Sequence, residues 1–301
     1  MDESIVNVFL IRHGDRADYD INTGKQWQAT ANMLPNQRVK DPPLSSIGHS
    51  QARDVSEVMK DFYDKLGKPK DTILLSSPYL RCIQTSAPTS DALGLPIQLE
   101  HGLAECHYAQ NYVADADERW AYFPQIDVEY KPLMMPKGND NDQPRFKKVF
   151  NISTCESFPL GYMKRILDFS EKLTNSLVEK YSCVSESSCK GSEDTEDTEG
   201  DTCGKMVVMF SHAASVALIA ALLKAKTVPW KMAPTGYFHL TLNLENKVWA
   251  LVNEETAGEN THCKNVAPGT FAWGFQNVKD AAEVWSNLIS SCSSNEKKEE
   301  E

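Results

Sequence analysis

Hydrophobic positions along the chain follow two patterns: short continuous runs and longer runs with helical spacing. The continuous runs share branched or aromatic side chains and polar flanks, and lie at 6–11, 72–75, 96–99 and 205–210. Such runs are typical of strands buried on both faces of a sheet. The segment 237–244 instead alternates between apolar and polar residues. It can pair with 248–252 across the turn at 245–247.

Apolar residues at helical spacing predict four helices, at 46–66, 80–93, 158–181 and 213–223. Ser45 or Ser46 can cap the first helix, and Gly67 ends it. The second helix stops at Gly94, and Pro88 inside it should kink or split it. No apolar run reaches the roughly 18 residues that a bilayer requires, so we expect no membrane span.

Strands that alternate with helices predict a three-layer α/β fold, in which helices cover both faces of a mostly parallel sheet. We expect one domain over residues 1–290. An insertion at 184–204 and a tail at 291–301 are acidic and polar, and both are expected to be disordered because they cannot bury apolar area. The segments 17–45 and 106–157 show no strong period and are predicted to be irregular.

Charge and cysteine content exclude some classes of partner and indicate the cellular compartment. The net charge is −11 over 301 residues, and most of it belongs to the two acidic segments. No basic stripe appears, which argues against nucleic acid as a partner. The acidic start lacks the basic region of a signal peptide, and the eight cysteines show no zinc spacing. We therefore expect reduced thiols and a cytoplasmic location.

Polar residues follow each of the four buried strands. They are Arg12 and His13, the segment 76–81 with Arg81, then Glu105, and finally His212. Because ligands bind beyond the carboxyl ends of parallel strands, these residues should share one edge of the sheet. Each residue alone has a simpler explanation, such as a structural histidine or a surface cation. The prediction rests on their combination in this order.

That combination suits the chemistry of a phosphate ester. The planar fork of arginine matches phosphate oxygens and stays charged. A neutral imidazole can attack phosphorus, and a second imidazole can stabilise the charge on the equatorial oxygens. A carboxylic acid can protonate the leaving oxygen. The sequence shows no carboxylate cluster for a metal, so we expect chemistry without a metal or other cofactor.

Five short motifs together resemble the histidine phosphatase superfamily, which includes the cofactor-dependent phosphoglycerate mutases. They are LIRHG at 10–14, DPPLSSIG at 41–48, SSPYLRCIQT at 76–85, GLAE at 102–105 and FSHA at 210–213. The resemblance implies a phosphoglycerate mutase-like fold of branch 1. Within the superfamily, RHGDR at 12–16, the long insertion, LRCIQT at 80–85 and FAW at 271–273 are most similar to two groups. These are the phosphatase domain of suppressor of T-cell receptor signalling proteins and the steroid-phosphate phosphatases.

The resemblance also implies roles for the matching residues. His13 would be the nucleophile that forms a phosphohistidine, and Glu105 would be the proton donor. The phosphoryl group would be bound by Arg12, Arg16, Arg81 and His212. The residues left without a role are Asp15, His49, His101, His107, His239 and His262.

The favoured function is a metal-independent phosphomonoester hydrolase, acting on a phosphopeptide (phosphotyrosine) or a small organic phosphate. A mutase-type phosphotransferase fits less well, because the polar segment 17–45 does not resemble the compact mutase loop. A catalytically weak phospho-ligand binder is disfavoured because all five core residues are present. A homodimer stays open. The aromatic residues that either line a leaving-group pocket or only pack loops are Trp27, Tyr108, Tyr112, Trp120, Tyr122 and Phe123.

Overall fold

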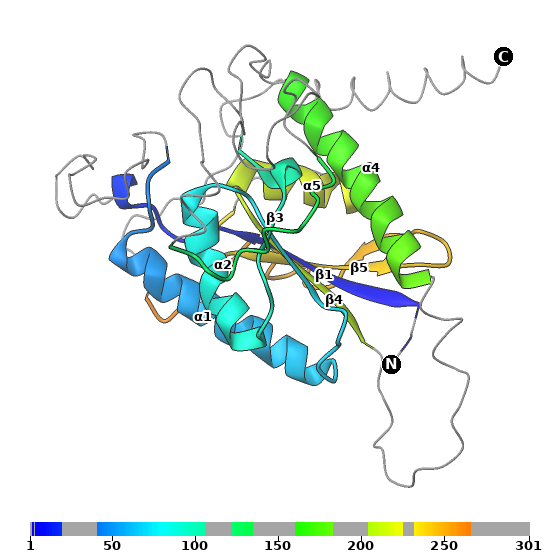
Figure 1. Cartoon of the computed structure of the whole chain (residues 1–301), viewed down its shortest axis with the longest axis horizontal. Coiled ribbons are helices and arrows are strands. Elements are labelled where there is room, and N and C mark those ends of the chain that lie inside the picture. Colours follow the sequence, from blue (N-terminus) through cyan, green and yellow to red (C-terminus); the bar gives the residue numbers. More distant parts are fainter. Residues whose placement is uncertain are drawn as a thin grey trace, which may run out of the picture.

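The structure is a computed structural model that describes residues 2, 4–19, 41–105, 122–134, 160–182, 204–224 and 232–265. The described segments form one sheet with helices on both faces (Figure 1). Three predictions lie outside the described residues: the disorder of the acidic tail, that of the acidic insertion except for its last residue, and most of the irregular segment 106–157.

In the described part of the chain, six strands form one sheet in the order β3-β2-β4-β1-β5-β6. The strands are β1 (Ile5–Arg12), β2 (Ile73–Ser76), β3 (Gln98–Leu99), β4 (Lys205–Ser211), β5 (Tyr237–Asn243) and β6 (Trp249–Leu251). The first four in this order are parallel to one another, whereas β5 and β6 are antiparallel to their neighbours. The predicted mostly parallel sheet is confirmed, and four strands end at one edge.

The helices of the described segments begin and end close to the predicted positions. They are α1 (Ser46–Lys65), α2 (Leu80–Leu93), α4 (Leu160–Ser182) and α5 (Ala213–Lys224), with short 3-10 turns at η1 (Ala17–Tyr19) and η2 (His101–Leu103). Ser45 caps α1, since its hydroxyl oxygen accepts the N–H of Gly48. Gly94 ends α2 with a φ of +66°, a left-handed conformation that glycine adopts without strain.

Two local predictions differ from the structure. The sequence predicted that Pro88 would either kink or split the helix α2. This helix runs unbroken through Pro88, so the split does not occur. The side chain of Pro88 is partly buried. The strand β3 covers Gln98–Leu99 instead of the predicted 96–99. Pro96 has no N–H to donate to a ladder. The next residue, Ile97, forms an isolated bridge with Ile126 instead.

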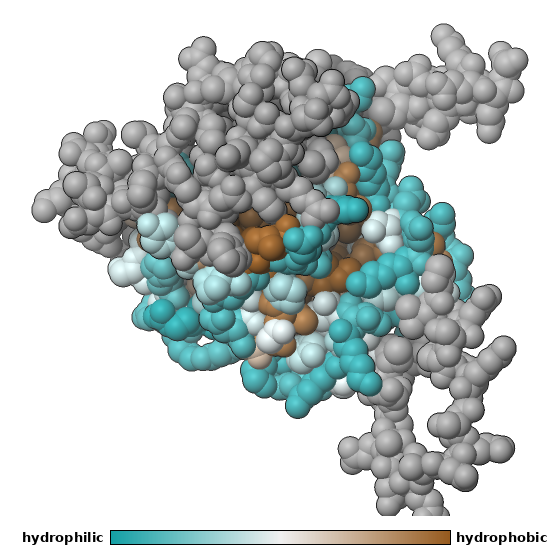
Figure 2. Space-filling model, viewed as in Figure 1, coloured by the Kyte–Doolittle hydropathy of each residue, from teal (hydrophilic) through white to brown (hydrophobic). Residues whose placement is uncertain are grey.

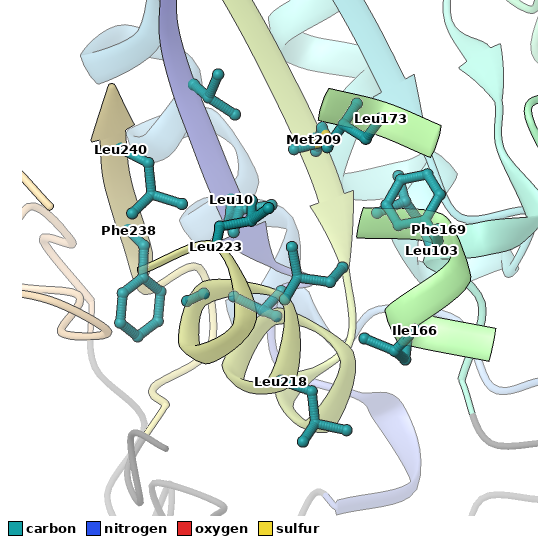
Figure 3. Packing of buried hydrophobic residues seen from close by; sticks show 14 of the residues in the cluster. Leu10, Leu103, Ile166, Phe169, Leu173, Met209, Leu218, Leu223, Phe238 and Leu240 are labelled. Atoms are coloured by element: carbon teal, nitrogen blue, oxygen red, sulfur yellow. The ribbon is translucent and has the colours of Figure 1, made fainter. Parts of the chain in front are cut away.

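Alternate residues of β1 pack against helices on opposite faces of the sheet. Val8 and Leu10 belong to a cluster with side chains of α4 and α5. Phe9 and Ile11 belong to a second cluster with side chains of α1 and α2. Figure 3 shows the first cluster, where labelled residues of the strands, α4 and α5 gather on one face. Burial on both faces explains the continuous apolar runs and confirms the three layers.

The described surface is mostly hydrophilic in the view of Figure 2, with a hydrophobic area near the middle. The large apolar side chains that are more than half exposed among the described residues are Tyr122, Val248 and Val252. None of the described helices combines the length and the apolar character needed to cross a membrane.

Candidate active site

The parallel strands bring four of the predicted site residues together. Arg12 is the last residue of β1, His13 follows it, and His212 follows β4. Arg12 pairs with Ser211 in the β1–β4 ladder, so the two histidines leave the sheet as neighbours. Their ring centroids are 5.4 Å apart at an interplanar angle of 65°. Arg81, in the first turn of α2, lies beside them.

The ring of His13 is buried, and a backbone contact fixes its orientation. Its Nδ1 lies 2.7 Å from the carbonyl oxygen of Gly14. A carbonyl oxygen only accepts, so Nδ1 carries the proton and Nε2 holds the lone pair. Burial lowers the pKa of His13 well below its usual value, and the charges of Arg81 and Arg12 lower it further. His13 is therefore neutral near pH 7, with Nε2 as a potential nucleophile.

The loop that carries His13 rests on the first turn of α1. A Cβ at Gly14 would lie 2.7 Å from the carbonyl oxygen of Gly48, and a Cβ at Gly48 would overlap the carbonyl oxygen of Asp15. Both positions therefore require glycine. The carboxylate of Asp15 accepts the hydroxyl of Ser45 at 2.7 Å, and its N–H donates to Gln51 at 2.8 Å. Asp15, which the sequence left without a role, fastens the loop of His13 to α1.

The second histidine, His212, is fully buried and held as one tautomer. Nη2 of Arg81 donates to its Nδ1 at 2.9 Å, because arginine offers no acceptor. In the neutral ring Nε2 then carries the proton and donates to the Ser77 hydroxyl at 2.8 Å. The ring of Tyr79 packs edge-on at 4.7 Å. Burial, then the charge of Arg81, lowers the pKa of His212 well below its usual value.

The guanidinium of Arg81 is 2 % exposed and is oriented by a buried acid. Its Nη1 lies 3.5 Å from Oδ1 of Asp41. The same carboxylate accepts the N–H of Leu80 at the start of α2. The guanidinium also lies 4.5 Å from the ring centroid of Tyr79. Asp41, the first residue of the DPPLSSIG motif, thus joins the helix start to the guanidinium of Arg81.

The other two predicted arginines have partners in the structure. Arg12 donates to the carbonyl oxygen of Met232. Arg16 forms a bidentate ion pair with Asp18, through Nε at 2.9 Å and Nη2 at 2.5 Å. The charge of Arg16 contributes to the lowered pKa values of His13 and His212, so its field reaches both rings. An anion that binds Arg16 must share it with Asp18 or displace that carboxylate.

Glu105 lies at the rim of this cluster, and its side chain is 29 % exposed. Its Oε2 is 3.6 Å from Nδ1 of His212 and 3.9 Å from Nη2 of Arg81. The structure therefore brings together every core residue predicted from the strand ends. A carboxyl group at this rim is in reach of an oxygen that leaves toward solvent.

Side chains from three other elements fix the turn that carries Glu105. Arg165 of α4 donates to the carbonyl oxygens of residues 101, 102, 104 and 105 at 2.8–3.3 Å. Ser211 donates to the carbonyl of residue 103 at 2.5 Å, and Ser215 donates to that of residue 104 at 3.0 Å. A Cβ at Gly102 would overlap the ring of Phe169. Gly102 and Ser211 lie in motifs that gave them no role, and no motif contains Arg165 or Ser215.

Glu100, directly before the turn, is a further buried acid that the sequence analysis missed. Its carboxylate accepts the N–H groups of Gly102, Leu133 and Met134 and the hydroxyl of Tyr130, at 2.7–3.1 Å. Burial raises its pKa. The acid therefore holds the segment 130–134 against the turn. An acidic residue directly after an apolar strand was the available signal.

The other described histidines lie apart from the cluster of His13, His212 and Arg81. His239 stacks on Phe9 and contacts Asn7 through Nε2 at 2.9 Å, and burial lowers its pKa to about 4. His101 belongs to the Glu105 turn, where burial and then the charge of Arg165 lower its pKa to about 4. His49 and His262 lie elsewhere on the surface and in the loop after β6, and His107 lies outside the described residues.

Two aromatic side chains of the predicted leaving-group pocket fall in the described segments. Phe123 is partly buried against the second core cluster, which fits the packing alternative, whereas Tyr122 is 53 % exposed. Trp27, Tyr108, Tyr112 and Trp120 lie outside the described residues.

The described segments contain two cysteines. Cys82 and Cys263 are free thiols, and the other six cysteines lie outside the described segments. Burial raises the pKa of Cys82 to about 12, so this thiol stays protonated beside His212. Among the described residues, no three or more His, Cys, Asp or Glu side chains are grouped to hold a metal ion.

Two neutral imidazoles, buried arginines and a rim carboxyl group at the edge of a parallel sheet define an α/β enzyme of the phosphatase and mutase type. Residues 8–130 match the family model of the histidine phosphatase superfamily (branch 1). This match supports a phosphatase. A search of curated proteins found no match.

Solved structures are similar to the chain at low sequence identity. The ecdysone phosphate phosphatase of Bombyx mori, solved with tungstate, has a TM-score of 0.52 at 18% identity over 89% of this chain and 98% of its own. This similarity shows a shared fold. A mycobacterial glucosyl-3-phosphoglycerate phosphatase scores 0.43 at 18% identity, covering 85% and 99% of the two chains. A phosphoglycerate mutase of Bacillus anthracis scores 0.45 at 12%, covering 86% and 95%.

Proposed function

We propose that the protein is a metal-independent phosphomonoester hydrolase that works through a phosphohistidine on His13. The observation that carries the proposal is the state of His13: its Nδ1 proton is engaged by the carbonyl of Gly14, and burial keeps the ring neutral. Nε2 is thereby left as the nucleophilic nitrogen. Arg12 and Arg81 lie close enough to lower its pKa, so the site already concentrates positive charge there.

In the first step, Nε2 of His13 attacks phosphorus and the bond from phosphorus to the ester oxygen breaks. The carboxylic acid of Glu105 gives its proton to the leaving oxygen, which departs as an alcohol. In the second step, the Glu105 carboxylate takes a proton from water, and the hydroxide formed attacks phosphorus. The P–N bond breaks, which releases inorganic phosphate and restores neutral His13 and protonated Glu105.

The positive charges needed in both steps come from side chains. Guanidinium groups of Arg12, Arg16 and Arg81 would bind the non-bridging oxygens, and His212 would donate its Nε2–H, which the Ser77 hydroxyl accepts in the structure, to one of them instead. These fixed charges would take the place that a metal ion holds in other phosphatases. The substrate class we propose is a phosphopeptide carrying phosphotyrosine or a small organic phosphate ester, met in the cytoplasm.

The test is hydrolysis of para-nitrophenyl phosphate in excess chelator by the wild type, His13→Ala and His49→Ala. His49 is an exposed histidine of α1 and serves as the matched control. We expect chelator-resistant turnover in the wild type and His49→Ala, and none in His13→Ala. Rapid denaturation during turnover should trap labelled phosphate on the protein in a form stable to base and labile to acid. Turnover that persists in His13→Ala would contradict the proposal.

The mutase alternative uses the same residues and is separated by its products. A mutase would interconvert 2- and 3-phosphoglycerate in the presence of bisphosphoglycerate, with little release of inorganic phosphate. A weak phospho-ligand binder would bind phosphate esters but turn them over no faster than His13→Ala. Assaying phosphate release and phosphoglycerate isomerisation on the same preparation therefore distinguishes the three functions.

A further inference from the structure

We infer that Arg165 of α4 is a positioning residue that sets the location of Glu105 as proton donor. This inference rests on the proposed function. The guanidinium of Arg165 donates to four backbone carbonyl oxygens of the turn that carries Glu105. It would therefore act through the backbone of the turn.

The need for such an anchor follows from the sheet. The strand β3 ends at Leu99, whose ladder partner is Ser76. Glu105 lies six residues farther along the chain, beyond the reach of strand pairing. His13 and His212, in contrast, each lie next to a paired residue of β1 or β4. Position along the sheet thus fixes the nucleophile, but it cannot fix the acid.

Arg165 replaces the missing strand contacts at both ends of the turn. Nη1 donates to the carbonyl oxygens of residues 101 and 102, at 3.3 and 2.8 Å. Nη2 donates to those of residues 104 and 105, at 3.0 and 3.3 Å. The rigid guanidinium fork holds these two pairs at a fixed separation, which a flexible ammonium group cannot do. The carbonyl of Glu105 itself is one of the four acceptors.

The guanidinium is in turn held by neighbours on both helices. Its central carbon lies 5.2 Å from the ring centroid of Tyr162, one helical turn earlier on α4. The Tyr162 hydroxyl is 2.8 Å from the hydroxyl of Ser215 on α5, which donates to the carbonyl of residue 104. Arg165, Tyr162 and Ser215 therefore connect two helices to the turn in one hydrogen-bonded and stacked network.

The competing explanation is that Arg165 only stabilises the fold. The two explanations differ in how the loss depends on the leaving group. Protonation of the leaving oxygen matters most for an alkyl phosphate, whose alkoxide is a poor leaving group, and least for 2,4-dinitrophenyl phosphate, which departs unprotonated. A displaced acid should therefore harm the alkyl ester selectively, whereas general destabilisation should harm both substrates equally.

The experiment compares kcat/KM for a series from dinitrophenyl to alkyl phosphates in wild type, Arg165→Ala, Arg165→Lys and Lys164→Ala. Lys164 is the exposed neighbouring cation on α4, so its variant removes the same charge without the turn contacts. We expect Arg165→Ala to lose roughly 10- to 100-fold on the alkyl ester, as for a displacement near 1 Å, and under about 3-fold on the dinitrophenyl ester. Arg165→Lys should be intermediate, and Lys164→Ala unchanged.

Glu105→Gln, alone and combined with Arg165→Ala, separates this inference from the proposed function. Glu105→Gln should lose roughly 10²- to 10⁴-fold on the alkyl ester, and adding Arg165→Ala should not increase the leaving-group selectivity further. If Glu105→Gln shows no leaving-group dependence, the proton-donor assignment fails and the inference fails with it. Glu105→Gln can instead show the leaving-group dependence while folded Arg165→Ala and Arg165→Lys lose the same factor in kcat/KM on all esters. That result would overturn only the positioning role of Arg165.

Discussion

The two sides of the site are built in different ways. On the side of the proposed nucleophile, which we call the nucleophile side, His13 and His212 directly follow neighbouring strands whose ladder places Arg12 opposite Ser211. On the side of the proposed proton donor, which we call the acid side, Glu105 lies at the end of a turn held by side chains of α4, α5 and β4. The first side obtains its geometry from backbone pairing. The second obtains it from individual side-chain contacts, and it is also the more exposed of the two.

This difference matches the precision that each chemical role requires. A nucleophile and its phosphate-binding partners must be held rigidly, and buried strand ends supply that rigidity. A proton donor must reach leaving groups of different shapes. A turn at the rim suits this role, because substitutions in its anchors can shift the carboxyl group without disturbing the sheet.

The largest expected effect comes from changing the fork of Arg81 on the nucleophile side. Arg81→Lys keeps the charge but cannot bind His212 and Asp41 together while also binding a phosphate. We expect kcat/KM for para-nitrophenyl phosphate to fall roughly 10²- to 10³-fold. Arg53→Lys, an exposed substitution on α1, serves as control. A loss below about tenfold would mean that the fork geometry is not required.

Two glycine substitutions test whether the nucleophile side and the acid side differ in their ability to accommodate an added methyl group. Gly48→Ala forces a Cβ against the carbonyl of Asp15, whereas Gly102→Ala forces one against the ring of Phe169. Each should lower the free energy of unfolding by about 1–3 kcal/mol, measured by urea denaturation. Only Gly102→Ala should be rescued, by adding Phe169→Leu, because a side chain can be exchanged and a backbone carbonyl cannot. If Phe169→Leu does not restore the stability of Gly102→Ala, the two sides do not differ in this respect.

The smallest expected effect on activity concerns a histidine outside both sides of the site. Burial alone lowers the pKa of His239 to about 4, whereas arginine charges add to the effect at His13. The unfolded chain binds a proton at His239 near pH 6.5, before the folded protein does. Stability from this group is thus complete above pH 6.5 and falls by about 1.4 kcal/mol per pH unit toward pH 4.

The variant His239→Gln should therefore show a shallower loss of stability with falling pH. Urea unfolding of wild type and variant at several pH values between 7 and 5 measures the two slopes. Activity at pH 7 should stay the same, because His239 contacts Asn7 and Phe9 and not the site. Equal slopes in the two proteins would show that His239 does not carry the proton uptake.

The sequence predicts the nucleophile side well, for a physical reason. A strand buried on both faces produces a continuous apolar run, so the polar residues that follow it, such as Arg12 and His13, stand out along the chain. The expectation that these residues lie close together did not depend on knowing the order of the strands in the sheet. Asp41 also appeared in a motif, although its contact with Arg81 became visible only in the folded chain.

The anchors on the acid side could not be predicted in the same way. Arg165 lies in an amphipathic helix, where a partly exposed arginine has no distinguishing pattern. Ser215 is a common residue type whose partner is distant in the sequence. Their roles depend on how α4 and α5 pack on the sheet, and no local periodicity encodes that arrangement. The two-residue length of β3 likewise depended on a long-range contact, that of Ile97 with Ile126.

The register of β1 against β4 also determines where the chain can tolerate a change in length. Inserting or deleting one residue within either strand would turn His13 or His212 toward the opposite face, because side chains alternate along a strand. Surface connections have no such constraint, so their length can vary without moving either imidazole. Within the described segments, the turn 245–247 between β5 and β6 is such a connection. A library of single-residue insertions should therefore include inactive stretches at β1 and at β4, separated by more than 190 residues of sequence but adjacent in the sheet.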